Sequence, residues 1–334
     1  MPDEKNISGC PATCHRSGPY SQRIRRHQGP AAAAVKDQKS LRSLFHGLTS
    51  RLEVVRYQAA RAVRNPDADA IHDARVASRR AAAVLGILAA GRIVKRSEAR
   101  GIRKTLRKMR RHGGVVRDWD ILLQSLSTTR RPGETGPLER WRHYILQRRS
   151  MAVRLFIKSA MSVCIEARLA RLPTQLSRMD AEVARKALYS GIYWHLRAAR
   201  KKAKKKLRRA MSEQSITATH QARISVKSLR YLYELGTEAK IISVRTLLAR
   251  LRNFQTLAGN LNDYAMAMRR LDELRTAIVP SEPSGDAVVT RLMNIQRSRI
   301  ARLTKQVRSA AQSVLESPGL KDDIDTLLED WRPV

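Results

Sequence analysis

Hydrophobic residues recur every three or four positions through most of the chain, the spacing of an amphipathic α-helix. The first run begins at Leu41. It stops near Asn65 and Pro66, which break a helix, and Asp67 or Asp69 can cap the helix that follows. The same pattern predicts helices near 41–64, 69–90, 95–112, 115–128, 137–170, 177–211, 218–235, 241–257, 261–278, 286–316 and 320–331.

Two motifs occur twice at nearly the same separation. The segment HDARVASR (72–79) matches HQARISVK (220–227), and LRKMRRHGGVVRDWD (106–120) matches LRNFQTLAGNLNDYA (251–265), at offsets of 148 and 145 residues. Two matches at nearly one offset indicate an internal repeat. We therefore predict an all-α fold of two tandem helical bundles, related by duplication with approximate twofold symmetry. The expected units are a flexible tail over 1–38, a first bundle over 39–172 and a second bundle over 173–334.

Composition supports helices and adds a strong charge signal. Aromatic residues make up only 4% of the chain, and Ala, Leu, Arg and Lys dominate. Lys and Arg number 66 against 29 Asp and Glu, which gives a formal net charge of +37. Such an excess indicates a polyanionic partner, for which nucleic acid, an acidic membrane and a phosphate polymer are the candidates. Composition alone does not choose among them.

Cysteine use and hydropathy indicate a cytoplasmic protein without a membrane span. Three cysteines, Cys10, Cys14 and Cys164, are too few for a disulfide framework. Cys10 and Cys14 lie near His15, but a fourth zinc ligand is missing, so no metal or other cofactor is expected. The longest apolar run, residues 81–91, is too short to cross a bilayer, and residues 1–35 lack the apolar block of a secretion signal.

Basic side chains follow two predicted helices as stripes. Like charges at helical spacing repel one another, so each stripe is interpreted as a ligand-binding surface and not as an ordinary solvated face. The first stripe contains Arg96, Arg100, Arg103, Arg107 and Arg111. The second contains Arg197, Arg200, Lys201, Lys204, Lys205 and Arg208.

The repeated motif places further cations on single helix faces. His72, Arg75 and Arg79 fall within about a 60° arc, and the second copy gathers its own set within about 80°. That second set is His220, Arg223, Lys227 and Arg230. Arg and Lys are the natural ligands of phosphate groups. Few aromatic residues accompany them as base-stacking platforms, so a specific nucleic-acid partner is not expected.

The histidines and carboxylates allow more than one interpretation. His46, His72-Asp73 and then Asp118 or Asp120 follow the His…His-Asp…Asp order of helical metal-dependent phosphohydrolases, but the arginines around His72 oppose a dication. A phosphorylated histidine would need a nucleotide site, and no glycine-rich motif for one is present. We favour histidines that line an anion-binding surface, or that bond a neighbouring helix at Asp118 or Asp263.

Asp118 and Asp263 themselves follow Gly-containing segments. We interpret them as helix caps or as partners of a buried arginine, and we propose no catalytic pair.

Taken together, these motifs resemble the CHAD family, the conserved histidine α-helical domain. The resemblance covers roughly residues 40–320 and rests on the two His-x-x-Arg motifs, VRDWDILL, LNDYAMAM and SLRYLYEL. It implies a duplicated helical bundle that binds long-chain inorganic polyphosphate along a basic channel, without catalysis, and that can associate with polyphosphate granules. The motif positions are His72, Arg75, Arg79 and Arg80 in the first copy and His220, Arg223, Lys227 and Arg230 in the second.

The two copies differ at two positions. Ala82 stands opposite Arg230, and Ser228 stands opposite Arg80, so the halves are expected to bind unequally. The predicted function is non-enzymatic polyphosphate binding in a Lys/Arg-lined groove. The alternatives are a non-specific nucleic-acid-binding protein and a metal-dependent phosphohydrolase centred on His72-Asp73.

Overall fold

The computed structural model describes residues 30–129, 135–278, 284–321 and 323–329. Over these residues the secondary structure is helical and contains no strand, which confirms the all-α prediction. The first half contains α1 (Pro30–Arg64), α2 (Ala68–Ala90), α3 (Arg96–Thr129), α4 (Thr135–Cys164) and α5 (Ala167–Ser177). The second contains α6 (Ala181–Glu213), α7 (Ile216–Glu238), α8 (Arg245–Ile278), α9 (Ser284–Leu315), α10 (Pro318–Lys321) and α11 (Ile324–Leu328).

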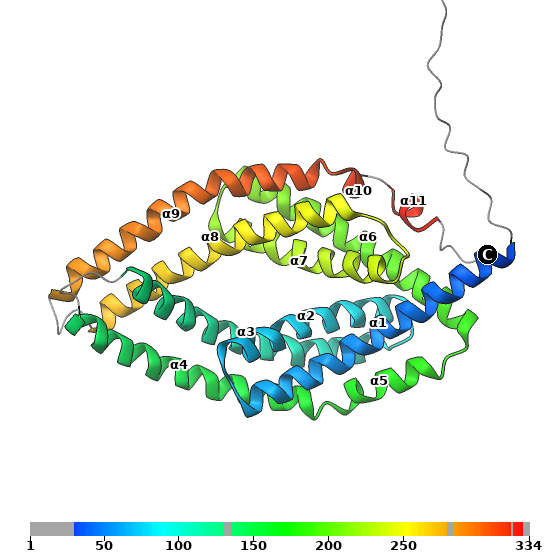
Figure 1. Cartoon of the computed structure of the whole chain (residues 1–334), viewed down its shortest axis with the longest axis horizontal. Helices are drawn as coiled ribbons and strands as arrows, with labels where there is room; N and C mark the ends of the chain where they lie inside the picture. The colour runs from blue at the N-terminus through cyan, green and yellow to red at the C-terminus, as the bar shows by residue number, and fades with distance from the viewer. Residues whose placement is uncertain (1–29, 130–134, 279–283, 322, 330–334) are drawn as a thin grey trace, which may run out of the picture.

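The helix order of the second half follows that of the first. Helices α2 and α7 each have 23 residues, and α3 and α8 each have 34. Helices α1 to α5 form the lower half of the molecule in Figure 1 and α6 to α9 the upper half. The duplication itself stays a prediction.

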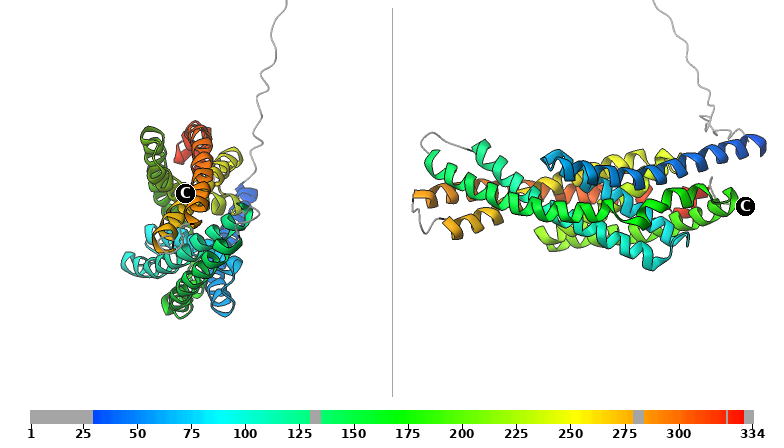
Figure 2. Two further views of the ribbon diagram at one scale, coloured as in Figure 1. Left: turned by 90° about the vertical axis from the view of Figure 1, so that its left-hand side faces the viewer. Right: turned by 90° about the horizontal axis from the view of Figure 1, so that it is seen from below.

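The two halves are joined through one hydrophobic core, whose buried residues run from Leu41 to Leu328. Helix α2 contacts both α6 and α7, and α3 contacts α8. The α3–α4 and α8–α9 hairpins meet at one end of the molecule (Figures 1 and 2), where the Gln296 amide donates to the Ser125 hydroxyl at 2.9 Å. The motif helices α2 and α7 therefore lie at the boundary between the halves.

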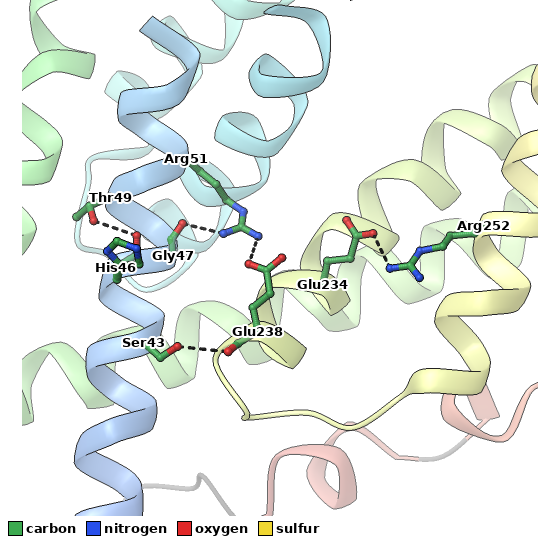
Figure 3. A network of polar contacts seen from close by, with 8 residues as sticks. All are labelled: Ser43, His46, Gly47, Thr49, Arg51, Glu234, Glu238 and Arg252. Carbon is green, nitrogen blue, oxygen red and sulfur yellow. Dashed lines mark hydrogen bonds and ion pairs between the residues drawn. The ribbon is translucent and has the colours of Figure 1, made fainter. Parts of the chain in front are cut away.

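Polar contacts add to this boundary near the middle of α1. The Arg51 guanidinium donates to the Glu238 carboxylate of α7 at 2.6 Å, and the Ser43 hydroxyl donates to the Glu238 carbonyl at 3.3 Å (Figure 3). Helices α2 and α6 approach each other through glycines: a Cβ on Gly191 would lie 2.4 Å from the Ile87 carbonyl oxygen. A larger residue would force these two backbones apart.

Several predicted helix boundaries are wrong. Helix α3 runs without a break through Gly113 and Gly114, and α8 runs through Gly259. Helix α5 contains Pro173 in its interior, and the expected helix over 137–170 is two helices separated at Ile165 and Glu166. Asp118 and Asp263 consequently lie inside long helices and cap neither of them.

The N-terminal segment is described only in part. Helix α1 begins at Pro30, inside the segment predicted as a tail over 1–38. The cysteines at 10 and 14 and the neighbouring histidine lie outside the described residues. In the part of the chain that is described, no helix is long and apolar enough to cross a membrane.

Candidate functional site

Cationic side chains from both halves gather where α2 faces α7. Arg75 and Arg79 come from α2, and Arg223 and Lys227 come from α7. Burial, together with the nearby charges of Arg223, Arg79, Arg75 and Arg230, lowers the pKa of Lys227 to about 6. The two His-x-x-Arg motifs, 148 residues apart in the sequence, thus build one site.

Helix α3 adds Arg110 to this group. Its guanidinium donates to the Ser78 carbonyl at 3.0 Å, and burial together with the charges of Arg79, Arg107 and Arg103 lowers its pKa to about 10. The predicted α3 stripe therefore leads into the same region through Arg103 and Arg107. We call the central group the cation cluster; its members are Arg75, Arg79, Arg110, Arg223 and Lys227.

Glycines of α3 and α8 lie beside the motif arginines. A Cβ on Gly113 would lie 3.0 Å from Arg75 Cδ, and one on Gly259 would lie 3.5 Å from Arg223 Nε. The Nε atoms of Arg75 and Arg223 are buried and lack a hydrogen-bond partner among the described residues. Gly113 therefore keeps α3 clear of Arg75, whereas Ala258 stands at the corresponding position of α8, and both arginines have unused donor capacity.

Tyr231 breaks the equivalence of the two halves. Its side chain is buried, forms a hydrogen bond with Arg79 across the boundary, and lies near Arg110 and Arg223. The position of the first half at the same offset of 148 residues is occupied by Ala83. One half thus supplies a phenol that positions an arginine of the other.

Two carboxylates stand beside the cation cluster. Asp118 lies 3.7 Å from Arg270, and Asp263 is close enough to Arg223 to raise the pKa of that arginine, opposing the effect of burial. Burial raises the pKa of Asp118 to about 6 against the opposing charges of Arg270 and Arg75. Four arginines and the Lys227 amine thus share two nearby acids, and the excess positive charge can be neutralised by a ligand with several negative charges in a row.

The family comparison agrees with this geometry. The CHAD domain model matches residues 46–272, about two thirds of the chain, and this span contains every member of the cation cluster. The chain belongs to the CHAD family. The crystal structure of the CHAD domain from the plant Ricinus communis is similar in fold, with a TM-score of 0.54 and 19% sequence identity over 81% of this chain and 91% of that one. No curated protein matches the sequence.

The two motif histidines of this CHAD domain differ in their contacts. The His220 Nδ1 lies 2.6 Å from the Asn262 side-chain oxygen, so the histidine bonds the residue next to Asp263 and not the aspartate itself. His72 is exposed. Partial burial and the adjacent arginines lower the pKa of both rings.

The remaining predicted residues near the CHAD motifs lie around the cation cluster. Arg80, Arg96 and Arg100 are exposed. Arg230 pairs with Glu234 at 3.2 Å and lies over the Tyr231 ring, 5.0 Å from its centroid.

The second predicted stripe lies on a different side of α6. His195 marks the inner side of this helix, because a Cβ on Gly86 of α2 would meet its ring and because Arg103 of α3 lowers its pKa in addition to burial. Lys204 follows nine residues later, about 180° around the helix. The side that faces α7 instead carries Lys206, which donates to Gln221 at 2.6 Å.

The residues of the phosphohydrolase alternative are not gathered. Asp73 pairs with Arg61 of α1 at 2.9 Å, and Asp120 pairs with Arg149 of α4 at 2.6 Å. Among the described residues, no group of three or more His, Cys, Asp or Glu side chains could hold a metal ion.

Several residues of the site were not predicted from the sequence. Arg110 follows Arg103 by seven residues and shares its helix face, a spacing that could have identified it. Tyr231 and Arg270 give no comparable signal, because their roles depend on contacts between the two halves.

Proposed function

We propose that this CHAD protein binds long-chain inorganic polyphosphate without catalysis, with the cation cluster as the main site. The observation that carries the proposal is the burial of cations from both halves beside too few carboxylates. A phosphate chain offers many negative oxygens in a uniform row, which Arg forks and the Lys227 ammonium can bind in succession. The membership of the CHAD family supports this ligand class.

The aromatic residue of the site favours a polymer without bases. The Tyr231 ring is buried, with Arg230 over it and its hydroxyl bonded to Arg79, so it offers no free face for stacking. We place the protein in the cytoplasm, where binding of the polymer would bring it to polyphosphate granules.

The proposal is tested by titrating labelled long-chain polyphosphate at near-physiological salt into the wild-type protein and a double variant, Arg79→Met with Arg223→Met. We expect the variant to bind at least about 100-fold more weakly, since two charge-assisted contacts are lost. It should also show a smaller dependence of affinity on salt, because fewer counterions are released. Removing two mutually repelling cations should leave the fold intact.

A matched control removes two exposed arginines elsewhere, Arg42→Met with Arg154→Met, and should bind almost as wild type. Equal weakening in both double variants would mean that only net charge matters. Competition completes the test: displacement of polyphosphate by equal phosphate equivalents of DNA or RNA would favour the nucleic-acid alternative, and retention would favour polyphosphate.

A further inference from the structure

The outer face of α6 combines a stripe of cations with an exposed tryptophan. We use the name α6 stripe for Arg197, Lys201, Lys204, Lys205 and Arg208. Trp194 precedes Lys201 by seven residues, so the two side chains lie on the same side of the helix. The Trp194 side chain is 53% exposed, and the Arg197 guanidinium lies 5.4 Å from its ring centroid. The stripe therefore has an aromatic group at one end.

The other sides of α6 are occupied by neighbouring elements. His195 faces α2, and Lys206 bonds α7 through Gln221. Toward the C-terminus, Arg200 donates to the Leu320 carbonyl beside α10 at 2.7 Å, and the Tyr193 hydroxyl donates to Asp325 of α11 at 3.4 Å. The α6 stripe lies on the side that remains.

The charge of this face is separate from that of the cation cluster. Burial lowers the pKa of Lys204, and the charges that add to this effect are Arg200 and Arg208 of the same helix. The two carboxylates of α6 are engaged elsewhere: Glu182 pairs with Lys186, and Glu213 pairs with Arg209. The α6 stripe therefore presents five positive charges without an acid of its own helix to neutralise them.

We propose that Trp194 and the α6 stripe form a binding surface for single-stranded nucleic acid, distinct from the cation cluster. Cations four residues apart rise about 6 Å along the helix axis, a step that a phosphodiester backbone can follow. An exposed indole offers a face on which a base can stack, and stacking requires bases that are not already paired. Inorganic polyphosphate has no base, so Trp194 distinguishes the two polymers.

A membrane surface fits this face less well. Interfacial helices expose a broad apolar side to the lipid. The apolar residues of this part of α6, Leu196, Ala203 and Leu207, are buried in the protein core. Nucleic acid uses both of the exposed features, the cations and the single aromatic ring.

The test measures binding of a single-stranded oligothymidylate to the full chain and to Trp194→Ala. We expect about tenfold weaker binding of the variant, the effect of losing one stacked base. Trp194→Phe should retain most of the affinity, and polyphosphate binding should be the same in all three proteins. Trp194 is exposed, so its replacement should not affect folding.

Fluorescence gives an independent readout. Trp119 and Trp141 are 4% and 0% exposed, and Trp331 lies outside the described residues. In a Trp331→Phe background, quenching by the oligonucleotide should therefore come mainly from Trp194 and be lost in Trp194→Ala. Polyphosphate should quench much less. Equal binding of the oligonucleotide by wild type and Trp194→Ala would overturn the proposal, as would an equal effect of this variant on a duplex. A failure of polyphosphate to bind would not overturn this proposal, because the two measurements concern different surfaces.

Discussion

The Arg270 guanidinium of α8 lies 3.7 Å from the Asp118 carboxylate of α3, so an ion pair connects the second half of the molecule with the first beside the cation cluster. The same guanidinium lies over the Trp119 ring, 4.2 Å from its centroid. Asp118 also acts on Arg75, whose pKa its charge raises against the larger effect of burial. If the proposed ligand binds at Arg75, Asp118 is an internal anion placed to compete with it.

Asp118→Asn should tighten polyphosphate binding about three- to tenfold, because a negative charge near Arg75 is removed. Asp120→Asn, two residues along the helix, is the matched control: Asp120 pairs with Arg149 at 2.6 Å and should not affect affinity in this direction. Titration of both variants checks the prediction. Unchanged affinity in Asp118→Asn would show that its carboxylate does not compete with the ligand.

The same variant has an expected effect on stability. The pKa of Asp118 is raised from 3.8 to about 6, so the folded protein binds more protons than the unfolded one between these values. The contribution of this group to stability therefore falls as pH rises through that window. The Tm of Asp118→Asn minus the Tm of wild type should therefore be larger at pH 7 than near pH 4. Thermal unfolding of both proteins at the two pH values measures this difference.

Arg110 and Arg111 offer a test of the cation cluster with adjacent residues. Arg110 is half-buried and bonded to Ser78, whereas Arg111 is exposed. Arg110→Met should weaken polyphosphate binding about tenfold, the effect of one charge-assisted contact. Arg111→Met removes the same charge and should have a much smaller effect. Equal effects in a binding titration would contradict the assignment of Arg110 to the site.

The glycines of α3 make a prediction about folding. A Cβ on Gly114 would have only Arg75 Nη2 nearby, at 4.0 Å, so Gly114→Ala should stabilise the helix by about 0.5–1 kcal/mol. A Cβ on Gly113 would lie 3.0 Å from both Arg75 and Phe156, so Gly113→Ala should destabilise the protein by about 1–3 kcal/mol. Chemical denaturation distinguishes the two. Destabilisation by Gly114→Ala would indicate that the helix is not continuous there.

These glycines also show the limits of sequence-based prediction. The hydrophobic period predicted the all-α fold, and the repeat predicted which helices carry the motif. The sequence also predicted turns at Gly113–Gly114 and near Gly259, because glycine lowers helix propensity. In the structure both helices continue through these glycines, and Gly113 leaves space for Arg75 and Phe156, a packing requirement that depends on neighbouring helices.

The residues of the site likewise fall into those that the sequence pattern predicts and those that it does not. His72, Arg75 and Arg79 could be found because the motif gathers them on one helix face. Their meeting with Arg223 and Lys227 could not, since it depends on how α2 and α7 pack. Spacing likewise predicted that Arg197 and Lys201 share one face of the helix, but it could not show which side of α6 faces the rest of the protein. That information comes from His195 and from Lys206.

Lys227 makes the last prediction, a coupling between ligand binding and protonation. Its pKa of about 6 means that its amine is mainly neutral at pH 7. The groups that oppose its charge are Arg223 and Arg230 on its own helix and Arg79 and Arg75 on α2. A bound polyanion reverses this balance and raises the pKa, so binding at pH 7 should take up protons, and affinity should rise as pH falls from about 8 to about 6.

Calorimetric titration of polyphosphate in two buffers of different ionisation enthalpy measures this uptake directly. Asp118, whose pKa is also about 6, contributes to it, so the variants must be compared. Lys227→Met should lose the larger share of the uptake, and Asp118→Asn the smaller. Because the native Lys227 binds fewer protons than the unfolded one between about 6 and 10.5, the stability of the free protein should also fall as pH is lowered through this range. Bound polyphosphate should reduce this loss of stability at lower pH. A proton uptake that is the same in Lys227→Met as in wild type would show that the Lys227 amine is already protonated before the ligand binds.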